Sequence, residues 1–374
     1  MKTYQVSQSQ IVTITFMFGF ASNTFLFSSL IKIGDYSSWY IYILSYGPAL
    51  FFLLLMTKVG QKVKNYSFLD YGNEIVGKWI HKLVLVYLFF FTLHITAFHI
   101  KLFIDFTAGT YYPDTPEEVL IFLFCFVCFM GAYAGVEPIG RVAQYFTFLS
   151  LFLGISIPLL LMNQVDYDMT IAFINRFDMA QVWEGTIFTT PWLMDIIIIL
   201  VIFHMIANPE KTGKSLAIGM GLHIITYIPI LIMVLLVLGP YFPTYSTVAE
   251  LEMLRQIQIA NFLQNVDPFI FSVWIISIFV RVSFCLFVFT ILFSKLVKIN
   301  DYKKIAPIMG LLLFIYTINI SDNSSEMELF ANEGFPGFVW SVTAIPILYL
   351  LVAKIRGIKS VTKGSEKTAS SDET

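Results

Sequence analysis

The sequence has few charged residues and few cysteines, and each shortage argues against a class of protein. Asp, Glu, Lys and Arg make up 13% of the 374 residues, about half of the roughly 25% found in soluble domains. The net charge is −2, which argues against nucleic acid as a partner. Cys125, Cys128 and Cys285 lie inside apolar runs without clustered His or acidic residues, so we expect no metal site and no redox centre.

The sequence also lacks the patterns of catalytic chemistry. It contains no nucleophile placed with a base and no nucleotide-binding loop. We therefore expect no catalytic residues and no cofactor, and we predict that the protein is not an enzyme.

Apolar residues are abundant instead: hydrophobic side chains make up 57% of the chain, and Phe alone occurs 38 times. They form repeated runs of about 20 residues, the length of a helix that crosses a bilayer. The alternating ten-residue pattern of a membrane barrel is missing, so each run is predicted to be a helix. The first run is too long for a signal peptide, and we expect no cleavage. The ten predicted spans are 10–33, 38–57, 83–109, 117–136, 139–163, 185–206, 216–239, 268–294, 305–321 and 336–353.

Basic residues predict the orientation of these spans, because Lys and Arg are enriched in cytoplasmic loops. With a cytoplasmic N-terminus, the two basic residues of the outer loops are Arg176 and Arg255, and Lys32, Lys101 and Arg281 lie within spans. The remaining 18 of the 23 basic residues are on the inner side. Both termini are therefore predicted to be cytoplasmic, in an integral protein of the lipid bilayer.

The ten spans divide into two sets of five, at about 10–163 and 185–353. With five spans each, the second set starts from the opposite side of the membrane, which is the inverted repeat of many secondary transporters. We predict an all-α fold: one transporter-like domain over residues 1–354, and a disordered cytoplasmic tail over 355–374. In such folds the first helix of each half is often broken, and the ligand lies at the break.

Both predicted first helices contain residues that weaken a helix at membrane depth. Span one carries FGFASNTF, and span six carries TTPW, in which Pro191 removes one backbone N–H. Tight packing of small residues between membrane helices is the alternative explanation. The candidate ligand-binding residues of the two segments are Gly19, Ser22, Asn23 and Thr24 in span one, and Thr189 and Thr190 in span six.

Three ionisable residues near the middle of spans complete the candidate ligand site. Asp195 in span six and Arg281 in span eight have opposite charges at similar depth, so we expect them to face each other and to offset the cost of burying charge. A purely structural ion pair is the alternative. His94, at the middle of span three, is either a site residue or a core histidine bonded to a backbone carbonyl.

Several short motifs resemble one known family. The markers, in order, are Asp35-Tyr36-Ser37-Ser38-Trp39, Gly77-Lys78, Pro113-Asp114-Thr115-Pro116, Gly135-Val136-Glu137-Pro138-Ile139-Gly140-Arg141, Asn208-Pro209-Glu210-Lys211, Phe262-Leu263-Gln264-Asn265-Val266-Asp267 and Trp274-Ile275-Ile276. Over residues 10–354 the chain resembles the spore germinant-receptor B-subunit family (GerAB or spore permease type) of the amino acid–polyamine–organocation transporter superfamily. It departs from the family at three points: it has no proline in the outer half of span one, Asp195 stands where Glu is more usual, and Asn265 stands where Arg is frequent.

The resemblance implies a ten-helix, five-plus-five fold and a subunit of a nutrient receptor in the spore inner membrane, acting with A and C subunits. It also implies a ligand site between spans one, three, six and eight for a small nutrient such as an amino acid. An ordinary secondary amino acid transporter stays open as an alternative, and an ion-conducting pore overlaps the receptor interpretation. Some relatives use a lysine in span five in place of a cation, and this chain has none there.

Overall fold

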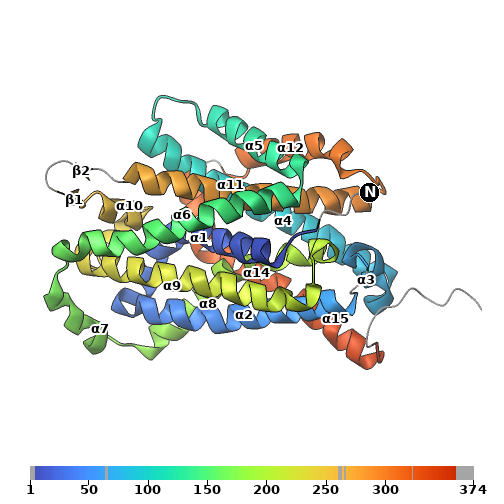
Figure 1. Cartoon of the computed structure of the whole chain (residues 1–374), viewed down its shortest axis with the longest axis horizontal. Helices are drawn as coiled ribbons and strands as arrows, with labels where there is room; N and C mark the ends of the chain where they lie inside the picture. The colour runs from blue at the N-terminus through green and yellow to red at the C-terminus, as the bar shows by residue number, and fades with distance from the viewer. Residues whose placement is uncertain (1–4, 64–65, 260–262, 265–266, 322, 359–374) are drawn as a thin grey trace, which may run out of the picture.

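The computed structural model describes residues 5–63, 66–259, 263–264, 267–321 and 323–358. The regular secondary structure of the described chain is helical apart from two paired strands of two residues each, and the long helices run along one axis (Figure 1). The first six α-helices are α1 (Gln8–Gly34), α2 (Ser38–Lys62), α3 (Phe68–Val76), α4 (Lys78–Tyr111), α5 (Glu117–Ala134) and α6 (Val136–Leu161).

After α6 the chain forms further long helices, which are separated by shorter elements. Its α-helices are α7 (Ala172–Asn175), α8 (Met179–Met194), α9 (Thr212–Leu238), α10 (Ala249–Leu254), α11 (Asp267–Leu296), α12 (Tyr302–Ile318), α13 (Ser324–Leu329), α14 (Phe335–Val342) and α15 (Ala344–Ile355). The 3₁₀ helices are η1 (Asp35–Ser37), η2 (Met162–Gln164), η3 (Tyr167–Ile171), η4 (Asp195–Met205), η5 (Pro209–Lys211) and η6 (Phe242–Tyr245). A π-helix, η7 (Phe330–Gly334), joins α13 to α14, and β1 (Gln258–Ile259) pairs antiparallel with β2 (Leu263–Gln264).

The all-α membrane fold predicted from the apolar runs is confirmed, whereas the number of ten spans is not. Every predicted run falls mainly on helical residues, but eight helical segments of the described chain are long and apolar enough to cross a membrane. One of them, Phe25–Lys62, joins the end of α1 to α2 through η1. The helix α12, expected as span nine, has 17 residues and is not among the eight.

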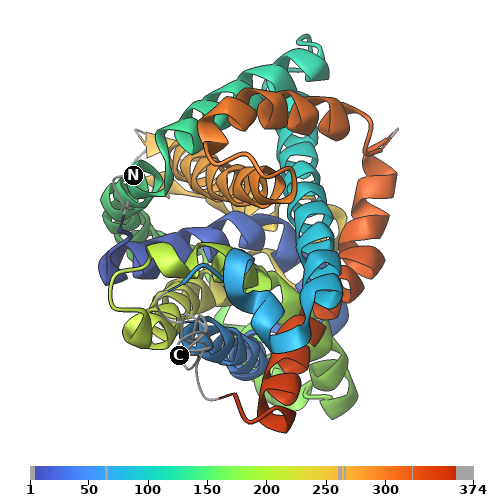
Figure 2. The ribbon, with the colours of Figure 1, turned by 90° about the vertical axis from the view of Figure 1, so that its right-hand side faces the viewer.

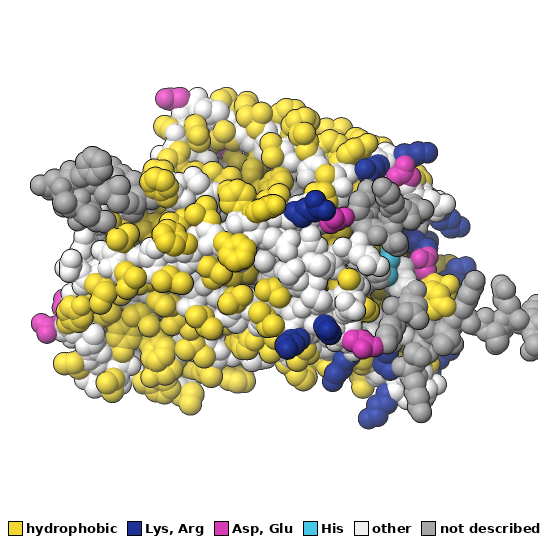
Figure 3. Space-filling model, in the orientation of Figure 1, with side chains coloured by type: hydrophobic (Ala, Val, Ile, Leu, Met, Phe, Trp, Pro, Cys, Tyr) yellow, Lys and Arg dark blue, Asp and Glu magenta, His cyan; other side chains and the backbone are white. Residues whose placement is uncertain are grey.

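The molecule has two chemically different ends. The short elements α7, α10, β1 and β2 lie at one end, and α3 and α15 lie at the other (Figure 1). We call these the α10 end and the α3 end. Lys and Arg side chains gather at the α3 end, while apolar side chains cover the middle of the molecule (Figure 3). The predicted tail falls largely on residues 359–374, which lie outside the described residues.

Helix α1 runs through the inside of the bundle and holds its parts together. It packs against α6, α8, α9 and α11, so helices of the two predicted halves interleave. Viewed from the α3 end, α5 and α12 lie together at one edge, away from α2 and α15 (Figure 2). The start of α1 is fixed by a capping box between Ser7 and Gln10. The preceding Val6 pairs with the end of η4, donating to the Met205 carbonyl at 2.8 Å.

Candidate functional site

Span six changes from α-helix to 3₁₀ helix at Asp195, four residues after Pro191. The predicted interruption of span six is therefore confirmed, as a change of helix type. A 3₁₀ stretch within a helix often marks a hinge. Because proline has no N–H, the carbonyl of Ile187 loses its helical donor. The indole Nε1 of Trp340 on α14 donates to that oxygen at 3.0 Å. The carbonyl freed by proline is therefore bound by the protein itself.

Asp195 and Arg281 form an ion pair at the centre of the bundle. Arg281 of α11 contacts the Asp195 carboxylate through Nη2, and each residue is 1% exposed. The expectation that the two charges face each other is confirmed. Two such charges are tolerated away from water only when they are paired and hydrogen-bonded, so the pair fixes the position of η4 against α11.

Arg281 also contacts α1. Its Nη1 donates to the Phe18 carbonyl at 3.0 Å and to the Ser22 hydroxyl. The guanidinium carbon lies 5.1 Å from the centroid of the Phe18 ring, within the range of a cation–π contact. One arginine thus connects α1, α11 and η4, which belong to three of the four spans in which the sequence placed the candidate site.

The predicted break in span one is wrong, because α1 is a continuous α-helix from Gln8 to Gly34. The residues that suggested a break are satisfied by other contacts. Ser22 donates to the Phe18 carbonyl four residues earlier, inside the helix. Gly19 serves close packing, since a Cβ there would lie 2.4 Å from the His223 ring. Thr24 belongs to α1, and its side chain lies outside the described residues.

Asn23 belongs to a buried polar cluster with Tyr42 on α2 and His223 on α9. Its Nδ2 donates to the Tyr42 hydroxyl at 2.6 Å and lies 2.8 Å from His223 Nε2. The Tyr42 hydroxyl donates in return to Asn23 Oδ1 at 2.9 Å. Sequence reasoning missed Tyr42 and His223. The available signal was His223 itself, an ionisable residue in the apolar run of span seven.

The remaining predicted site residues are Thr189, Thr190 and His94, and the hydrogen bonds of Thr190 and His94 are with other residues than the ion pair. Thr190 donates to the Thr186 carbonyl in its own helix, whereas the buried Thr189 hydroxyl has no hydrogen-bond partner among the described residues. His94 is half-buried and lies 2.9 Å from the Tyr316 hydroxyl of α12. The structure therefore pairs His94 with α12, away from the contacts of Asp195 and Arg281.

A neighbour of His94 lies closer to the candidate site. His99 on α4 is 1% exposed and packs against Trp192, three residues before Asp195, with ring centroids 6.2 Å apart. Its Nδ1 lies 2.6 Å from the Ile95 carbonyl. Its Nε2 and the Trp192 indole nitrogen are buried and without hydrogen-bond partners in the described part of the chain.

Comparison with known proteins identifies the family to which this arrangement belongs. A sequence model of the family described as "Spore germination protein" matches residues 5–325. The chain belongs to the spore germination protein family. The individual relatives are distant. Spore germination protein YndE of Bacillus subtilis is 20% identical over 307 residues, covering 81% of this chain and 83% of the relative.

Two further relatives of Bacillus subtilis are similar at comparable distance. Spore germination protein KB is 25% identical over 309 residues, covering 79% of this chain and 80% of that protein. The putative spore germination protein YfkT is 27% identical over 272 residues, covering 69% and 71%. The resemblance inferred from the short motifs is therefore confirmed at the level of the family.

Solved structures show the same fold at low identity. A Na⁺-coupled sialic acid symporter in a substrate-bound outward-open state has a TM-score of 0.69 and 12% identity, covering 93% of this chain and 79% of the symporter. MhsT in complex with L-phenylalanine has a TM-score of 0.64 and 14% identity, covering 95% and 92%. This spore germination protein is thus a multi-pass membrane protein whose family and fold are those of permeases and transporters, not of enzymes.

Proposed function

We propose that the protein is the B subunit of a spore nutrient-germinant receptor and that it senses a small nutrient at the Asp195–Arg281 pair. The nutrient carries both an ammonium and a carboxylate, as an amino acid does. Binding favours one conformation of the bundle, and partner subunits respond to that conformation. The protein lies in the spore inner membrane with both termini in the cytoplasm, and it acts with A and C subunits.

One observation carries this proposal: a buried pair of opposite charges joins the 3₁₀ segment η4 to α1 through a single arginine. A zwitterion matches such a pair. Its carboxylate takes the place of Asp195 on Arg281, and its ammonium takes the place of Arg281 on Asp195. No net charge is added to the interior, so the exchange avoids the cost of burying an unpaired ion.

The exchange also gives the ligand a means of moving helices. Arg281 holds the Phe18 carbonyl and the Ser22 hydroxyl of α1. A ligand carboxylate on Arg281 competes with these contacts, so α1 and η4 lose a direct connection. A ligand shifts a conformational equilibrium only by its differential affinity for the two states, and the competition supplies that difference.

A secondary transporter is the second candidate function. The fold supports it, since the similar structures include a Na⁺-coupled symporter and a complex with L-phenylalanine. The two functions share the same site and differ in whether the ligand crosses the membrane. The predicted orientation is the same for both, and the basic side chains gathered at the α3 end support it (Figure 3).

Binding and uptake measured on one preparation separate the two candidates. The full chain is reconstituted in liposomes, and each standard L-amino acid is tested first for binding and then for accumulation inside the liposomes. A sensing subunit binds one or more of these ligands without accumulating them, and Asp195→Asn weakens the binding. Accumulation at a rate that follows binding would support the transporter. Binding unaffected by Asp195→Asn would contradict the proposed site.

A further inference from the structure

A polar cavity lies at the α10 end of the molecule, among different residues from the Asp195–Arg281 pair. Its volume is about 250 Å³, room for roughly eight water molecules at about 30 Å³ each. It is bounded by α1, the end of α4, the loop before α10, and the segment from α13 to η7. The polar side chains that line it include Ser28, Ser29, Lys32, Asp105, Glu328 and Asn332. We call it the α10-end cavity.

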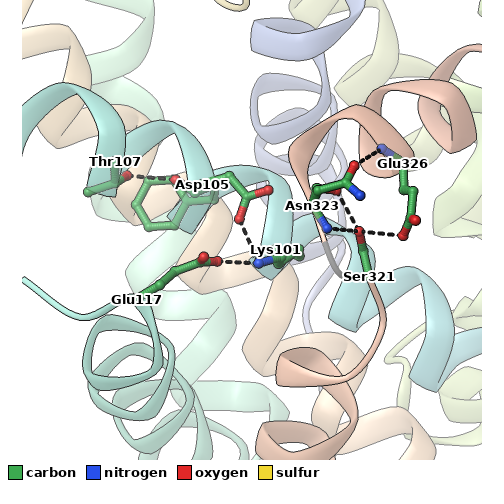
Figure 4. A network of polar contacts seen from close by, with 8 residues as sticks. Lys101, Asp105, Thr107, Glu117, Ser321, Asn323 and Glu326 are labelled. Atoms are coloured by element: carbon green, nitrogen blue, oxygen red, sulfur yellow. Dashed lines mark hydrogen bonds and ion pairs between the residues drawn. The ribbon is translucent and has the colours of Figure 1, made fainter. Parts of the chain in front are cut away.

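Asp105 supplies a buried carboxylate to this cavity. Its side chain is 10% exposed, and Lys101 Nζ lies 3.0 Å from its Oδ1. The other oxygen, Oδ2, has no hydrogen-bond partner among the described residues. Lys101 is shared with Glu117 at the start of α5, and Figure 4 shows both carboxylates approaching the same lysine nitrogen. One buried cation therefore faces two carboxylates, and the group carries a net charge of −1 when all three are ionised.

The opposite charge is present elsewhere on the cavity lining. Lys32, near the end of α1, is an exposed residue that lines the cavity and forms no ion pair within the described part of the chain. The buried hydroxyl of Ser28, one turn earlier on the same helix, also lacks a hydrogen-bond partner there. A polar group removed from water costs free energy unless it is hydrogen-bonded. The cavity thus has an acceptor of an ammonium on α4 and a donor to a carboxylate on α1.

The lining also reaches a segment of unusual backbone. Asn332 lies in the π-helix η7, and its Oδ1 accepts a hydrogen bond from Ser29 of α1 at 2.6 Å. Single π-helical turns often occur at functional sites. Phe335, directly after η7, packs on Trp192 with ring centroids 4.3 Å apart. A molecule in the cavity therefore contacts η7 through Asn332, and η7 is followed by Phe335, which packs on Trp192 of α8.

We propose that the α10-end cavity is a second ligand site and that it takes a small amino-acid zwitterion, with the ammonium on Asp105 and the carboxylate on Lys32. The site does not depend on the function proposed for the Asp195–Arg281 pair, since the two share no residue. The volume suits a single small molecule of this class. Because Lys32 lies on α1 and Asp105 on α4, a ligand needs both its carboxylate and its ammonium to bind with full affinity.

Protection of an engineered cysteine from a thiol reagent tests the proposal. Ser28→Cys places a thiol in the cavity lining of the full chain, while Cys125, Cys128 and Cys285 are buried. Modification by cationic aminoethyl methanethiosulfonate is timed with each standard L-amino acid present in turn. At least one amino acid should slow modification of the Ser28→Cys thiol. The amine obtained by removing the carboxylate of that amino acid should protect the thiol better than the acid obtained by removing its amino group. Thr110→Cys, exposed on α4 and outside the lining, should not be protected.

Two matched variants decide whether Asp105 holds the ligand. Asp105→Asn and Glu117→Gln each remove one carboxylate beside Lys101 and leave the other, so the lysine stays paired in both. Because Asp105 lines the cavity and Glu117 does not, Asp105→Asn should raise the amino acid concentration needed for protection by roughly tenfold or more. Glu117→Gln should leave it close to the parent value, and Asp195→Asn should do the same.

Three results would overturn the proposal. The first is that no L-amino acid slows modification of the Ser28→Cys protein. The second is that Asp105→Asn and Glu117→Gln have equal effects. The third is that Asp195→Asn removes the protection while Asp105→Asn leaves it. The third result would assign the protection to the Asp195–Arg281 site, so failure of the second site is distinguishable from failure of the first.

Discussion

Trp340 donates its indole N–H to the main-chain oxygen of Ile187 at 3.0 Å, and this is the oxygen that Pro191 leaves without a helical donor. The contact joins α14 to α8 just before the 3₁₀ segment that contains Asp195. A tryptophan 153 residues further along the chain thus completes the hydrogen bonding of the interrupted span. Within a bilayer no water replaces a lost donor.

Trp340→Phe should therefore destabilise the protein. The change keeps an aromatic ring against Phe52 but leaves the Ile187 carbonyl without a donor. The expected loss is about 1–3 kcal/mol, the cost of an acceptor left unsatisfied where the bilayer offers no water to replace the donor. Thermal unfolding in detergent measures it. In a Pro191→Ala background the alanine supplies the missing N–H, so Trp340→Phe should cost less there. Equal costs in the two backgrounds would show that the indole does not replace the helical donor.

Gly19→Ala should destabilise α1 against α9. The added Cβ would lie 2.4 Å from the His223 ring, which must move away from Asn23. Overpacking of this kind costs about 1–3 kcal/mol. Gly221→Ala on α9 is the matched control, because its nearest neighbour is the Tyr46 hydroxyl at 3.9 Å. A lowered melting temperature is expected for Gly19→Ala alone. A control that loses as much stability would remove the role assigned to the His223 contact.

Cysteine labelling from the two sides of the membrane tests the predicted orientation. Tyr245 at the α10 end is 91% exposed, and Trp79 at the α3 end is 77% exposed. In intact cells a membrane-impermeant reagent should modify Tyr245→Cys from outside. It should modify Trp79→Cys only after the membrane is opened. Labelling of Trp79→Cys in intact cells would reverse the orientation derived from the basic residues.

Of the two predicted helix interruptions, the one in span six is present and the one in span one is absent. Proline acts through a local covalent constraint, so Pro191 predicted the interruption of span six without any knowledge of its neighbours. Gly19, Ser22 and Asn23 are weaker signals, because tertiary contacts override local preference. His223 and Tyr42 supply those contacts from other helices, and nothing in the order of residues joins them to Asn23.

The ion pair and the π-helix also differ in whether the sequence could predict them. Asp195 and Arg281 were predictable as partners, since unpaired charges are costly at membrane depth and both lie near the middle of a span. The contacts of Arg281 with the Phe18 carbonyl and the Ser22 hydroxyl depend on how α11 packs against α1, which the sequence does not show. The π-helix η7 has no simple sequence pattern and was not predicted. It was found only in the structure, together with the cavity that it lines.

Glu250 should make stability depend on pH. The residue lies on α10, outside the membrane-spanning segments, and burial raises the pKa of its carboxyl to about 8 from an ordinary value of 4.5. Between these values the folded protein holds a proton that the unfolded chain has released. Its contribution to stability is therefore complete below pH 4.5 and decreases as the pH rises towards 8, by on the order of 1.4 kcal/mol per pH unit.

Glu250→Gln removes this dependence, so the variant should gain stability relative to the parent as the pH rises through that window. Melting temperatures in detergent across the window measure the difference. Glu252→Gln on the same helix is the control, because that side chain is 32% exposed and paired with Arg255. A constant difference between Glu250→Gln and the parent at every pH would contradict the assignment of the proton to Glu250.

The central claim is that the Asp195–Arg281 pair holds the nutrient, and it must be separated from a purely structural role. Either single change, Asp195→Asn or Arg281→Gln, leaves one buried charge without its partner, which costs about 3–5 kcal/mol. Both should lower the amount of protein in the membrane. The double change leaves two neutral groups that hydrogen-bond each other, so abundance should recover. Abundance alone therefore reports the structural part of the pair.

The most direct measurement is the nutrient dose–response of germination in spores that carry the double variant Asp195→Asn with Arg281→Gln, at matched abundance. A ligand held by charge exchange loses two charge-assisted hydrogen bonds, each worth about 1.5–3 kcal/mol. The nutrient concentration for half-maximal response should therefore rise by roughly a hundredfold or more. Recovered abundance with an unshifted dose–response would show that the pair is structural and that the nutrient binds elsewhere.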